Sequence, residues 1–595
     1  MADRHHAWNP GLTSDIPQRL WPKVTLFTNE NAFVSYAEAK ELSDLTGLTT
    51  LELTSLRPER LAKHALLVRV TADLTVADGP DYAQLGINLR SMVATIFNSY
   101  VEPELDEIRQ AVEAERKIVL SRVQKTIHTA FVAANDSEQA TASKPAGRPS
   151  FWSALFAKKS RATHTPVAEP PSDIEALERL ESMIKGSTCE NDRMCMQALL
   201  KCARTIVAQR GRLLPDHDLL ARIVTNQLMN ELASSVVDSM IDALWLAAVE
   251  AEGYRFLPVQ SAPVVMNVKG ASASGKSTIR PQQKHLAERL GIPWEDFALI
   301  SPDYWRKYLI DYSSLGEDYQ YGAMLSGREL EIVDKKLDDY IAKKASMKKM
   351  SHMLIDRFRF DSFALDIDRS ETSRLLSRFA NQVYLFFMVT HPKHTVERAW
   401  KRGNQTGRYK AVDDLLFHNV EAFTGMPALF LSWVNSKDKQ IHFEYLDNDV
   451  PLGELPRTAA FGHNGKLVIL DAQLMLNVDR YRKVNVSARS AEQVFEPADL
   501  DANENLDFAV QCARTVEQIV FADQETMQAY AAVQNGKMLW WDSDYLQTLT
   551  DDDDVLHILA ALGHSASSCD HERPDFAALA PEVEKSAMVG HWSAR

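Results

Sequence analysis

The sequence predicts a multidomain α/β protein whose core is a parallel sheet with helices on both faces, flanked by mainly helical N- and C-terminal regions. An apolar run at residues 263–268 has the composition of a buried parallel strand, and apolar runs at residues 297–300 and 381–389 repeat it. A helical pattern at residues 278–290 follows the first of these strands. Strands that alternate with helices are typical of a parallel sheet covered on both faces.

Length and composition limit the class of protein. The chain has 595 residues, which is too long for a single core and indicates several domains. A net charge of -15 argues against a general nucleic-acid binder, so we expect no nucleic acid as a partner. Five cysteines in so long a chain do not make a disulfide framework, and Cys189, Cys195 and Cys202 lack the close spacing of a zinc site.

The first residues do not resemble a secretion signal, because residues 1–9 contain no apolar core. The most apolar helical stretch, at residues 236–254, carries four carboxylates, namely Asp238, Asp242, Glu250 and Glu252. We therefore interpret it as a buried helix and expect no transmembrane segment. These features predict a cytoplasmic protein.

Five regions differ in composition along the chain. They are an N-terminal α+β or helical region at 1–132, a disordered linker at 133–173, a helical region at 174–256, a central α/β domain at 257–484 and an acidic, mostly helical region at 485–595. The linker is rich in Ser, Thr, Ala and Pro and has little to bury. Within the first region we expect a strand at 65–76 and a long helical pattern over 82–131.

Two further segments have a recognisable pattern. Apolar residues recur at spacings of three and four over residues 219–232, after Pro215 and Asp216, which predicts a helix that packs into a core. The aromatic cluster at residues 151–156 lies inside the linker beside basic residues. We interpret it as a hydrophobic tether, with a docking peptide or a membrane contact as the alternatives.

A glycine-rich loop follows the first strand of the central domain. It consists of Gly270, Ala271, Ser272, Ala273, Ser274, Gly275, Lys276 and Ser277, with Thr278 opening the next helix. This spacing matches the phosphate-binding P-loop, in which backbone N–H groups and the positive end of a helix cradle phosphates. In such a loop Lys276 contacts the β- and γ-phosphates and the Ser277 hydroxyl ligates Mg²⁺. The loop therefore predicts ATP and Mg²⁺ as cofactors, the alternative being a chance match on a Ser/Gly turn.

Asp303 and Arg306 follow the second strand, at residues 297–300. The carboxyl end of a strand lies at the edge where open α/β sheets bind ligands. Asp303 is therefore a candidate base that accepts a proton from an acceptor hydroxyl, while Arg306 contacts the acceptor or its phosphate. The structural alternative for Asp303 is a helix N-cap, and the two roles are compatible.

Basic residues surround the turn at Gly407 that follows the strand at 381–389. Arg398, Arg402 and Arg408 are spaced by four and six residues. Their charge suits a lid that closes over a triphosphate. A solvated basic helix face is the alternative.

The glycine loop alone does not distinguish kinases from other P-loop proteins. The guanine-specific signature is missing, because residues 435–438 have the wrong order. An ABC-type ATPase needs a catalytic glutamate directly after its Walker B aspartate. This chain has Arg357 at the position after Asp356. The kinase interpretation is therefore favoured.

The order of these parts resembles the zeta toxin family of P-loop kinases over roughly residues 264–474. The resemblance rests on the glycine loop, Asp303 and Arg306, the segment at 321–330, the turn at Gly407 and Arg408, and the closing strands at 443–448 and 465–471. Members of that family phosphorylate UDP-N-acetylglucosamine and related UDP-sugars. The family usually has Glu-Gly-Thr after its third strand, whereas this chain has the different sequence of residues 356–361.

The resemblance implies roles for individual residues. Asp303 is the base, and Lys276 and Arg408 bind phosphate with help from Arg402. Arg306, Tyr321 and Arg328 lie on the substrate side. Asp356 takes the acidic role near Mg²⁺ together with Ser277.

The predicted function is that of an ATP-dependent phosphotransferase which phosphorylates a hydroxyl of a small molecule, a nucleotide-sugar if the resemblance extends to the substrate. The alternatives are a toxin or effector kinase acting on a target-cell component, and a non-catalytic NTP-binding switch. We expect ATP and a small-molecule acceptor as partners. Zeta toxins are restrained by helical partners, so residues 1–256 are a candidate for regulation in cis or for binding a protein partner. The alternative is that these helices cover a sheet edge and are needed for folding.

Overall fold

A computed structural model describes residues 5–79, 82–132, 173–357, 380–451, 453–549, 553–563 and 587–591. The described residues belong to two compact units. The first unit draws on Met1–Leu20, Leu66–Thr95 and Val249–Arg595, and the second on Trp21–Ala65 and Ile96–Ala248. The linker expected at 133–173 and its aromatic cluster at 151–156 lie outside the described residues, except for Asp173.

The first unit is built on a mixed sheet in the order β10-β9-β8-β7-β6-β5-β4-β1-β3-β2. The strands are β1 (Val264–Gly270), β2 (Phe297–Ile300), β3 (His352–Asp356), β4 (Gln382–Val389), β5 (Gln440–Asp447), β6 (Arg457–His463), β7 (Lys466–Ile469), β8 (Gln518–Ala522), β9 (Ala529–Gln534) and β10 (Lys537–Trp541). The five strands β1 to β5 are neighbours in the sheet and are parallel to one another, as the sequence predicts. Beyond β5 antiparallel pairs extend the sheet, with one parallel pair between β7 and β8.

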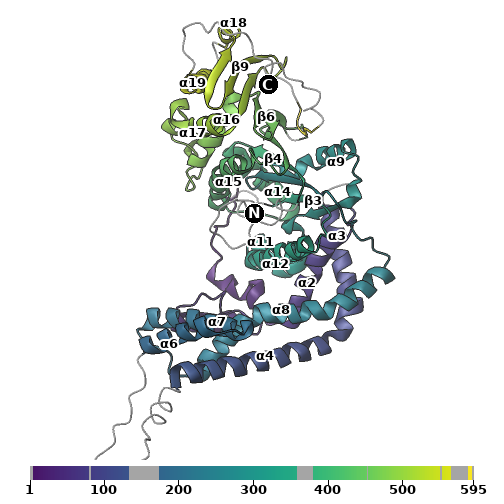
Figure 1. The fold of residues 1–595 in the computed structure, drawn as a ribbon, viewed down its shortest axis with the longest axis vertical. Coiled ribbons are helices and arrows are strands. Elements are labelled where there is room, and N and C mark those ends of the chain that lie inside the picture. Colours follow the sequence, from purple (N-terminus) through teal and green to yellow (C-terminus); the bar gives the residue numbers. More distant parts are fainter. Residues whose placement is uncertain are drawn as a thin grey trace, which may run out of the picture. The chain divides into compact units, whose positions relative to one another are not determined.

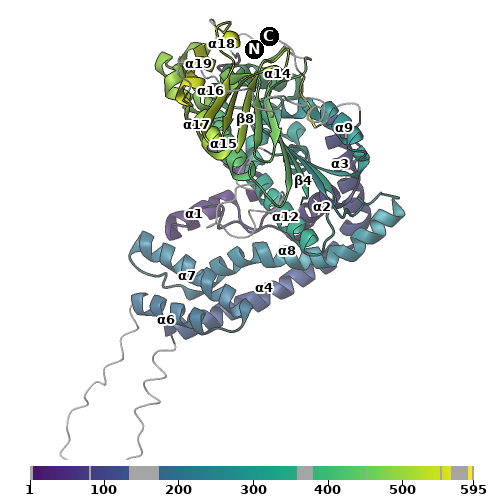
Figure 2. The same ribbon diagram turned by 45° about the horizontal axis from the view of Figure 1, so that its top comes forward.

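Helices cover both faces of the parallel part, which confirms the predicted α/β arrangement. On one face Leu286 of α9 (Arg280–Arg289) packs on Met266 and Phe386. On the other face Phe430 of α15 (Val412–Trp433) packs edge-on against Phe387. Neighbouring residues of one strand point to opposite faces, so Phe386 and Phe387 mark the two sides. Figure 2 shows α9 and α15 on opposite sides of the sheet.

Further helices complete the first unit. They are α3 (Tyr82–Ile96), α10 (Arg306–Leu309), α11 (Gly322–Leu325), α12 (Gly327–Ser346), α14 (Pro392–Thr406), α16 (Ala472–Arg480), α17 (Asp507–Thr515), α18 (Ser543–Leu546) and α19 (Asp553–Ala561). The residues at 66–95, which lie far from the glycine loop in the sequence, contribute Leu85 to the same core as Met266.

The second unit is helical. It contains α1 (Tyr36–Thr46), α4 (Leu105–Ile127), α6 (Asp173–Gly186) and α7 (Glu190–Arg210), most of α8 (His217–Ala251) and the first half of α2 (Pro58–Asp73). Figure 1 shows α4, α7 and α8 side by side. As predicted, α8 begins directly after Asp216, whose carboxylate accepts a hydrogen bond from the N–H of Leu219.

By length and composition, α8 is the one described helix that is apolar enough to cross a membrane, and 33% of its most apolar window is buried. A single helix of this kind is weak evidence for a span, because core helices of soluble proteins have the same properties. Two polar side chains of α8 have protein partners. Asn226 accepts a hydrogen bond from Arg116 of α4, and Asn230 donates to the carbonyl of Thr54.

Two secondary-structure predictions are wrong. The strand expected at 65–76 is the second half of α2, which opens with Pro58 at a position that favours helix starts. All sides of this half of the helix are buried. The sequence therefore lacks the recurrence of apolar residues every three to four positions that marks a half-exposed helix. The region at 485–595 is not mainly helical in its described part, because β8, β9 and β10 extend the sheet. The long helix expected over 82–131 is present but is interrupted near Pro103 between α3 and α4.

Candidate active site

The glycine loop leaves β1 where the connections of the sheet change sides. From β1 the chain passes to β2 and β3 on one side and then to β4 on the other, and open α/β sheets bind ligands at such a point. A Cβ on Gly270 would lie 2.9 Å from the Cβ of Met388. Gly275 has a φ of 93°, and a Cβ there would lie 2.2 Å from Nδ2 of Asn448. Both positions therefore require glycine.

Two side chains from the ends of neighbouring strands hold the loop. Asn448, just beyond β5, donates to the carbonyl of Ser274 at 2.7 Å. The Thr390 hydroxyl, just beyond β4, donates to the same carbonyl at 3.0 Å. Because this carbonyl is held in place, the backbone of the loop is fixed relative to the carboxyl edge of the sheet.

The loop presents unused hydrogen-bond donors. Within the described residues, no acceptor meets the backbone N–H groups of Ala273, Gly275 and Lys276. The ammonium of Lys276 donates to the carbonyls of Gly270 at 3.0 Å and Ala271 at 2.8 Å. Burial lowers the pKa of Lys276, although nearby carboxylates oppose the shift. Free N–H groups of one loop, beside a helix start, form a cradle for an anion.

Asp303 lies at the same edge and is paired with two arginines. Its Oδ2 is 2.5 Å from Nη2 of Arg408, and its Oδ1 is 3.2 Å from Nε of Arg306. Gly407 ends α14 in a left-handed conformation, with a φ of 74°, directly before Arg408. Burial opposes ionisation of Asp303, but Arg408 and Arg306 outweigh it and lower its pKa. The structure thus brings the predicted base into contact with a predicted phosphate ligand.

A second cationic group borders this pair. Arg402 interacts electrostatically with Asp303, Lys276 and Lys410. Lys410 donates a hydrogen bond to His418 and lies 3.2 Å from the carboxylate of Asp414. Burial lowers the pKa of Lys410 to about 8 against the pull of Asp414.

Sequence reasoning missed Lys410, Asp414 and His418. Burial and the nearby Lys410 lower the pKa of His418 to about 2, so the ring is neutral and can accept the hydrogen bond. The sequence did offer one signal. Lys410, Asp414 and His418 follow the turn at Gly407 and are spaced by four residues, which is the spacing of one face of a helix.

The two predicted Mg²⁺ ligands are free to bind. Among the described residues, no hydrogen bond or ion pair engages the carboxylate of Asp356 or the hydroxyl of Ser277. Burial raises the pKa of Asp356, and the neighbouring Lys276 opposes this. No group of three or more His, Cys, Asp or Glu side chains that suits a metal occurs in the described ranges. A hydroxyl, a carboxylate and phosphate oxygens are a donor set that Mg²⁺ accepts, because it keeps several waters.

The predicted substrate-side residues are only partly brought together. Arg306 donates to the carbonyl of Ala323 at 2.6 Å, which ties it to the start of the segment at 321–330. Tyr321 is buried in that segment. Arg328 instead pairs with Glu331 on the exposed side of α12, with a side chain 66% exposed.

Tyr312 is a residue of this neighbourhood that sequence reasoning missed. Its ring packs on Gly322, where a Cβ would lie 2.6 Å from a ring carbon. Burial raises the pKa of Tyr312, and Arg306 and Arg408 act on it electrostatically. The sequence offered no distinguishing signal, because Tyr312 is one of several tyrosines between the second strand and the following helix.

Arg357 has a structural environment that accounts for its presence after Asp356. Its guanidinium is buried and pairs with Asp338 at 2.5 Å and Asp334 at 2.8 Å, both on α12. The remaining residues of the sequence that departs from the zeta toxin pattern, 358–361, lie outside the described residues. Arg398 of the expected lid donates to the carbonyls of Asn448 and Val450, so it supports the loop after β5.

A polar cavity of about 650 Å³ lies on the other side of Thr390, at the ends of β4 and β5. Its lining includes His391, Asp447, Gln473 and Asn477. Burial lowers the pKa of His391 to about 4, so this ring is neutral. Thr390, which holds the glycine loop, is one of the residues that line the cavity.

In comparisons with family models, curated proteins and solved structures, no match to this chain was found.

Proposed function

We propose that the protein is a Mg²⁺- and ATP-dependent phosphotransferase that transfers the γ-phosphoryl group to a hydroxyl of a small molecule. The observation that carries the proposal is the cradle of free N–H groups around Lys276, with Asp303, Asp356 and Arg408 at the same sheet edge. Unpaired donors beside cations favour a polyanion. A carboxylate next to that anion supplies the base that hydroxyl phosphorylation needs.

Each group then has a role. The loop amides and Lys276 hold the β- and γ-phosphates, and Arg402 and Arg408 balance the charge that develops on the transferred group. Mg²⁺, held by Ser277 and Asp356, supplies further neutralisation when bound. Asp303 accepts the proton of the acceptor hydroxyl, and Arg306 orients the acceptor.

The cavity lined by Thr390 is the candidate site for the nucleoside of ATP, because its volume of about 650 Å³ is in the range of small-molecule sites. The acceptor class is proposed from the resemblance to zeta toxins, which points to a nucleotide-sugar. A toxin or effector kinase would catalyse the same phosphoryl transfer, with a component of a target cell as the acceptor.

ADP release with and without a small-molecule extract tests the proposal. A kinase releases ADP rapidly only when an acceptor is present, and a phosphorylated product appears by mass spectrometry. Slow ADP release that the extract does not change indicates a nucleotide switch. Asp303→Asn is the matched variant, which removes proton acceptance with little change of volume and abolishes product formation under the proposal.

A further inference from the structure

Glu444 is a carboxylate in the middle of β5 that is only 2% exposed. Burial raises its pKa, so its charge needs donors. Oε1 accepts from the Thr458 hydroxyl at 2.5 Å and from the N–H of Gly590 at 3.0 Å, and Oε2 accepts from the N–H of Val589 at 2.8 Å. Two of the three donors are therefore consecutive backbone groups of one segment near the end of the chain.

Three further backbone groups of that segment, residues 587–591, also have hydrogen-bond partners. Arg289 at the end of α9 donates to the carbonyl of Met588 at 2.5 Å. The N–H of Thr458 donates to the carbonyl of His591 at 2.9 Å, and the N–H of His591 donates to the carbonyl of Pro456 at 3.1 Å. This is the pattern by which proteins recognise an added peptide through its main chain.

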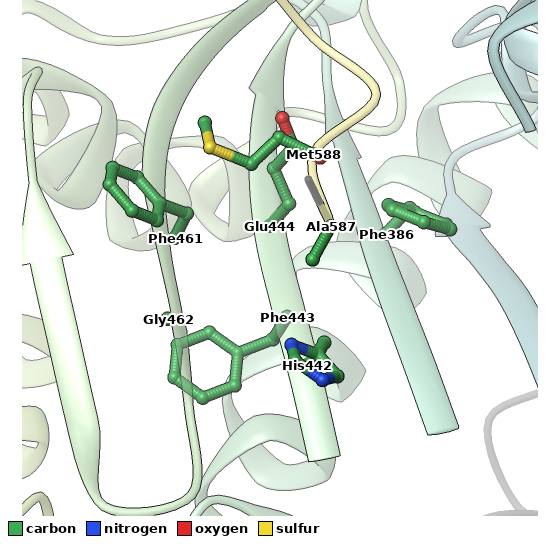
Figure 3. A pocket seen from close by; sticks show the side chains of 8 residues that line it. All are labelled: Phe386, His442, Phe443, Glu444, Phe461, Gly462, Ala587 and Met588. Carbon is green, nitrogen blue, oxygen red and sulfur yellow. The ribbon is translucent and has the colours of Figure 1, made fainter. Parts of the chain in front are cut away.

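Side chains of the segment are matched as well. Val589 is 3% exposed and belongs to the core cluster of Phe386 and Leu446. Met588 packs in a cluster with Phe461. Figure 3 shows Glu444 pointing from its strand toward the segment that carries Ala587 and Met588, with Phe461 beside Met588.

Gly590 admits no side chain. A Cβ there would lie 2.4 Å from the Thr458 hydroxyl, 2.6 Å from a methyl carbon of Leu446 and 2.9 Å from Oε1 of Glu444. Approaches under about 3 Å force a neighbour to move, and here the neighbours are the buried groups that form the site.

We propose that Glu444, Thr458 and Arg289 form a peptide-binding site for a short segment of two apolar residues followed by glycine, and that residues 587–591 of the same chain occupy it. The site binds two consecutive N–H groups of the segment through Glu444 and one carbonyl through Arg289. It buries Val589 in the apolar core, and it leaves no room for a side chain at the next position, so it selects glycine there. The proposal is independent of nucleotide chemistry.

Gly590→Val in the full chain tests the site, with Gly186→Val as the control, because a Cβ on Gly186 has no neighbour within 4 Å. We expect amide hydrogen exchange at Val589 and Gly590 to become faster by about tenfold or more in Gly590→Val and to be unchanged in Gly186→Val. A synthetic peptide carrying Ala587–His591 should then bind the Gly590→Val protein and not the wild type, whose site is filled.

The same peptide with valine in place of glycine should not bind. Unchanged exchange in Gly590→Val, or peptide binding that ignores the glycine, would overturn the proposal. A concentration-dependent dimer of the wild type that the peptide dissociates would show that the occupant belongs to a second copy, which also overturns it. Should Gly590→Val fail to fold, Arg289→Gln removes the donor to the carbonyl of Met588 and should accelerate the same exchange.

Discussion

The carboxylate of Asp303 and the guanidinium of Arg408 lie 2.5 Å apart, so the proposed base and a proposed phosphate ligand neutralise each other. Arg408 helps to lower the pKa of Asp303, which makes the carboxylate a weak proton acceptor while the pair persists. A triphosphate that forms an ion pair with Arg408 would leave the carboxylate of Asp303 without this partner. Under the proposed function, nucleotide binding would therefore break this ion pair.

Asp303→Asn should tighten ATP binding by roughly three- to tenfold, because Arg408 no longer has to leave a carboxylate. Removing a negative charge also helps any anion, so calorimetry is done in a double-mutant cycle with Arg408→Gln. The gain should shrink in the Arg408→Gln background. An equal gain in both backgrounds would mean that the ion pair does not oppose nucleotide binding.

Lys276→Ala should weaken ATP binding and lower turnover by roughly 10²-fold or more, the scale for losing a preorganised electrostatic contact. The ammonium of Lys276 donates to the carbonyls of Gly270 and Ala271, and these two hydrogen bonds hold it at the loop. Lys284→Ala removes a half-exposed lysine from α9 and serves as the control for charge loss. Calorimetry that finds equal ATP affinity in folded Lys276→Ala and Lys284→Ala rules out phosphate binding by the loop.

Gly275→Ala should abolish most ATP binding while the protein stays folded. Gly275 and Gly291 both have positive φ, so alanine strains the backbone at either position. Only the alanine at 275 meets a neighbour, Nδ2 of Asn448, whereas a Cβ on Gly291 has open space. Equal loss of ATP affinity in Gly291→Ala would show that general destabilisation, and not the shape of the loop, causes the effect.

Residues 66–95 should be needed for folding of the first unit. Leu85 is 1% exposed and lies in the sheet core, so Leu85→Ala should lower the free energy of unfolding by about 2–5 kcal/mol. Ile87 of the same helix is 49% exposed, and Ile87→Ala should stay within about 0.5 kcal/mol of the wild type. Denaturant unfolding gives both values. A chain beginning near Leu257 should aggregate, and a soluble, more active one would instead favour regulation in cis.

ATP affinity should fall as the pH rises through about 8. Burial lowers the pKa of Lys410 to about 8, so its charge is present below that pH and lost above it. A bound triphosphate favours the charged form, and the last ionisation of a terminal phosphate, with a pKa of about 6, is nearly complete at pH 8. Calorimetry between pH 7 and pH 9.5 should show a decline in the wild type that is reduced in Lys410→Gln. A parallel decline in both proteins would assign the titration to another group, such as Lys276.

The parallel part of the sheet was predictable because its strands are continuous apolar runs. These runs are flanked by the glycine loop or by segments with a helical pattern. The glycine loop and Asp303 were predictable for the same reason, since each follows such a run directly. The closing strand at 465–471 was predicted and contains β7, whereas β8, β9 and β10 were missed. Asn535 and Gly536, both with positive φ, form a two-residue turn between β9 and β10. Asn-Gly between strands is a strong hairpin signal, and the surrounding acidic composition concealed it.

The ion pairs of the site could not be read from sequence. Arg357 was noted as an arginine in place of a glutamate, but its buried partners Asp334 and Asp338 lie on a separate helix. Pairing of Asp303 with Arg408 depends likewise on where the turn at Gly407 directs the chain. Such contacts are set by tertiary packing, which local patterns do not encode.

Val589 shares a core cluster with Leu85 and Met266, so residues far apart in the sequence meet in one core of the sheet. During synthesis on the ribosome this core stays open until residue 589 has emerged. Arg289 likewise finds its acceptor, the carbonyl of Met588, only at that stage. An interrupted translation product would therefore display apolar surface beside the glycine loop and be a target for proteases and chaperones.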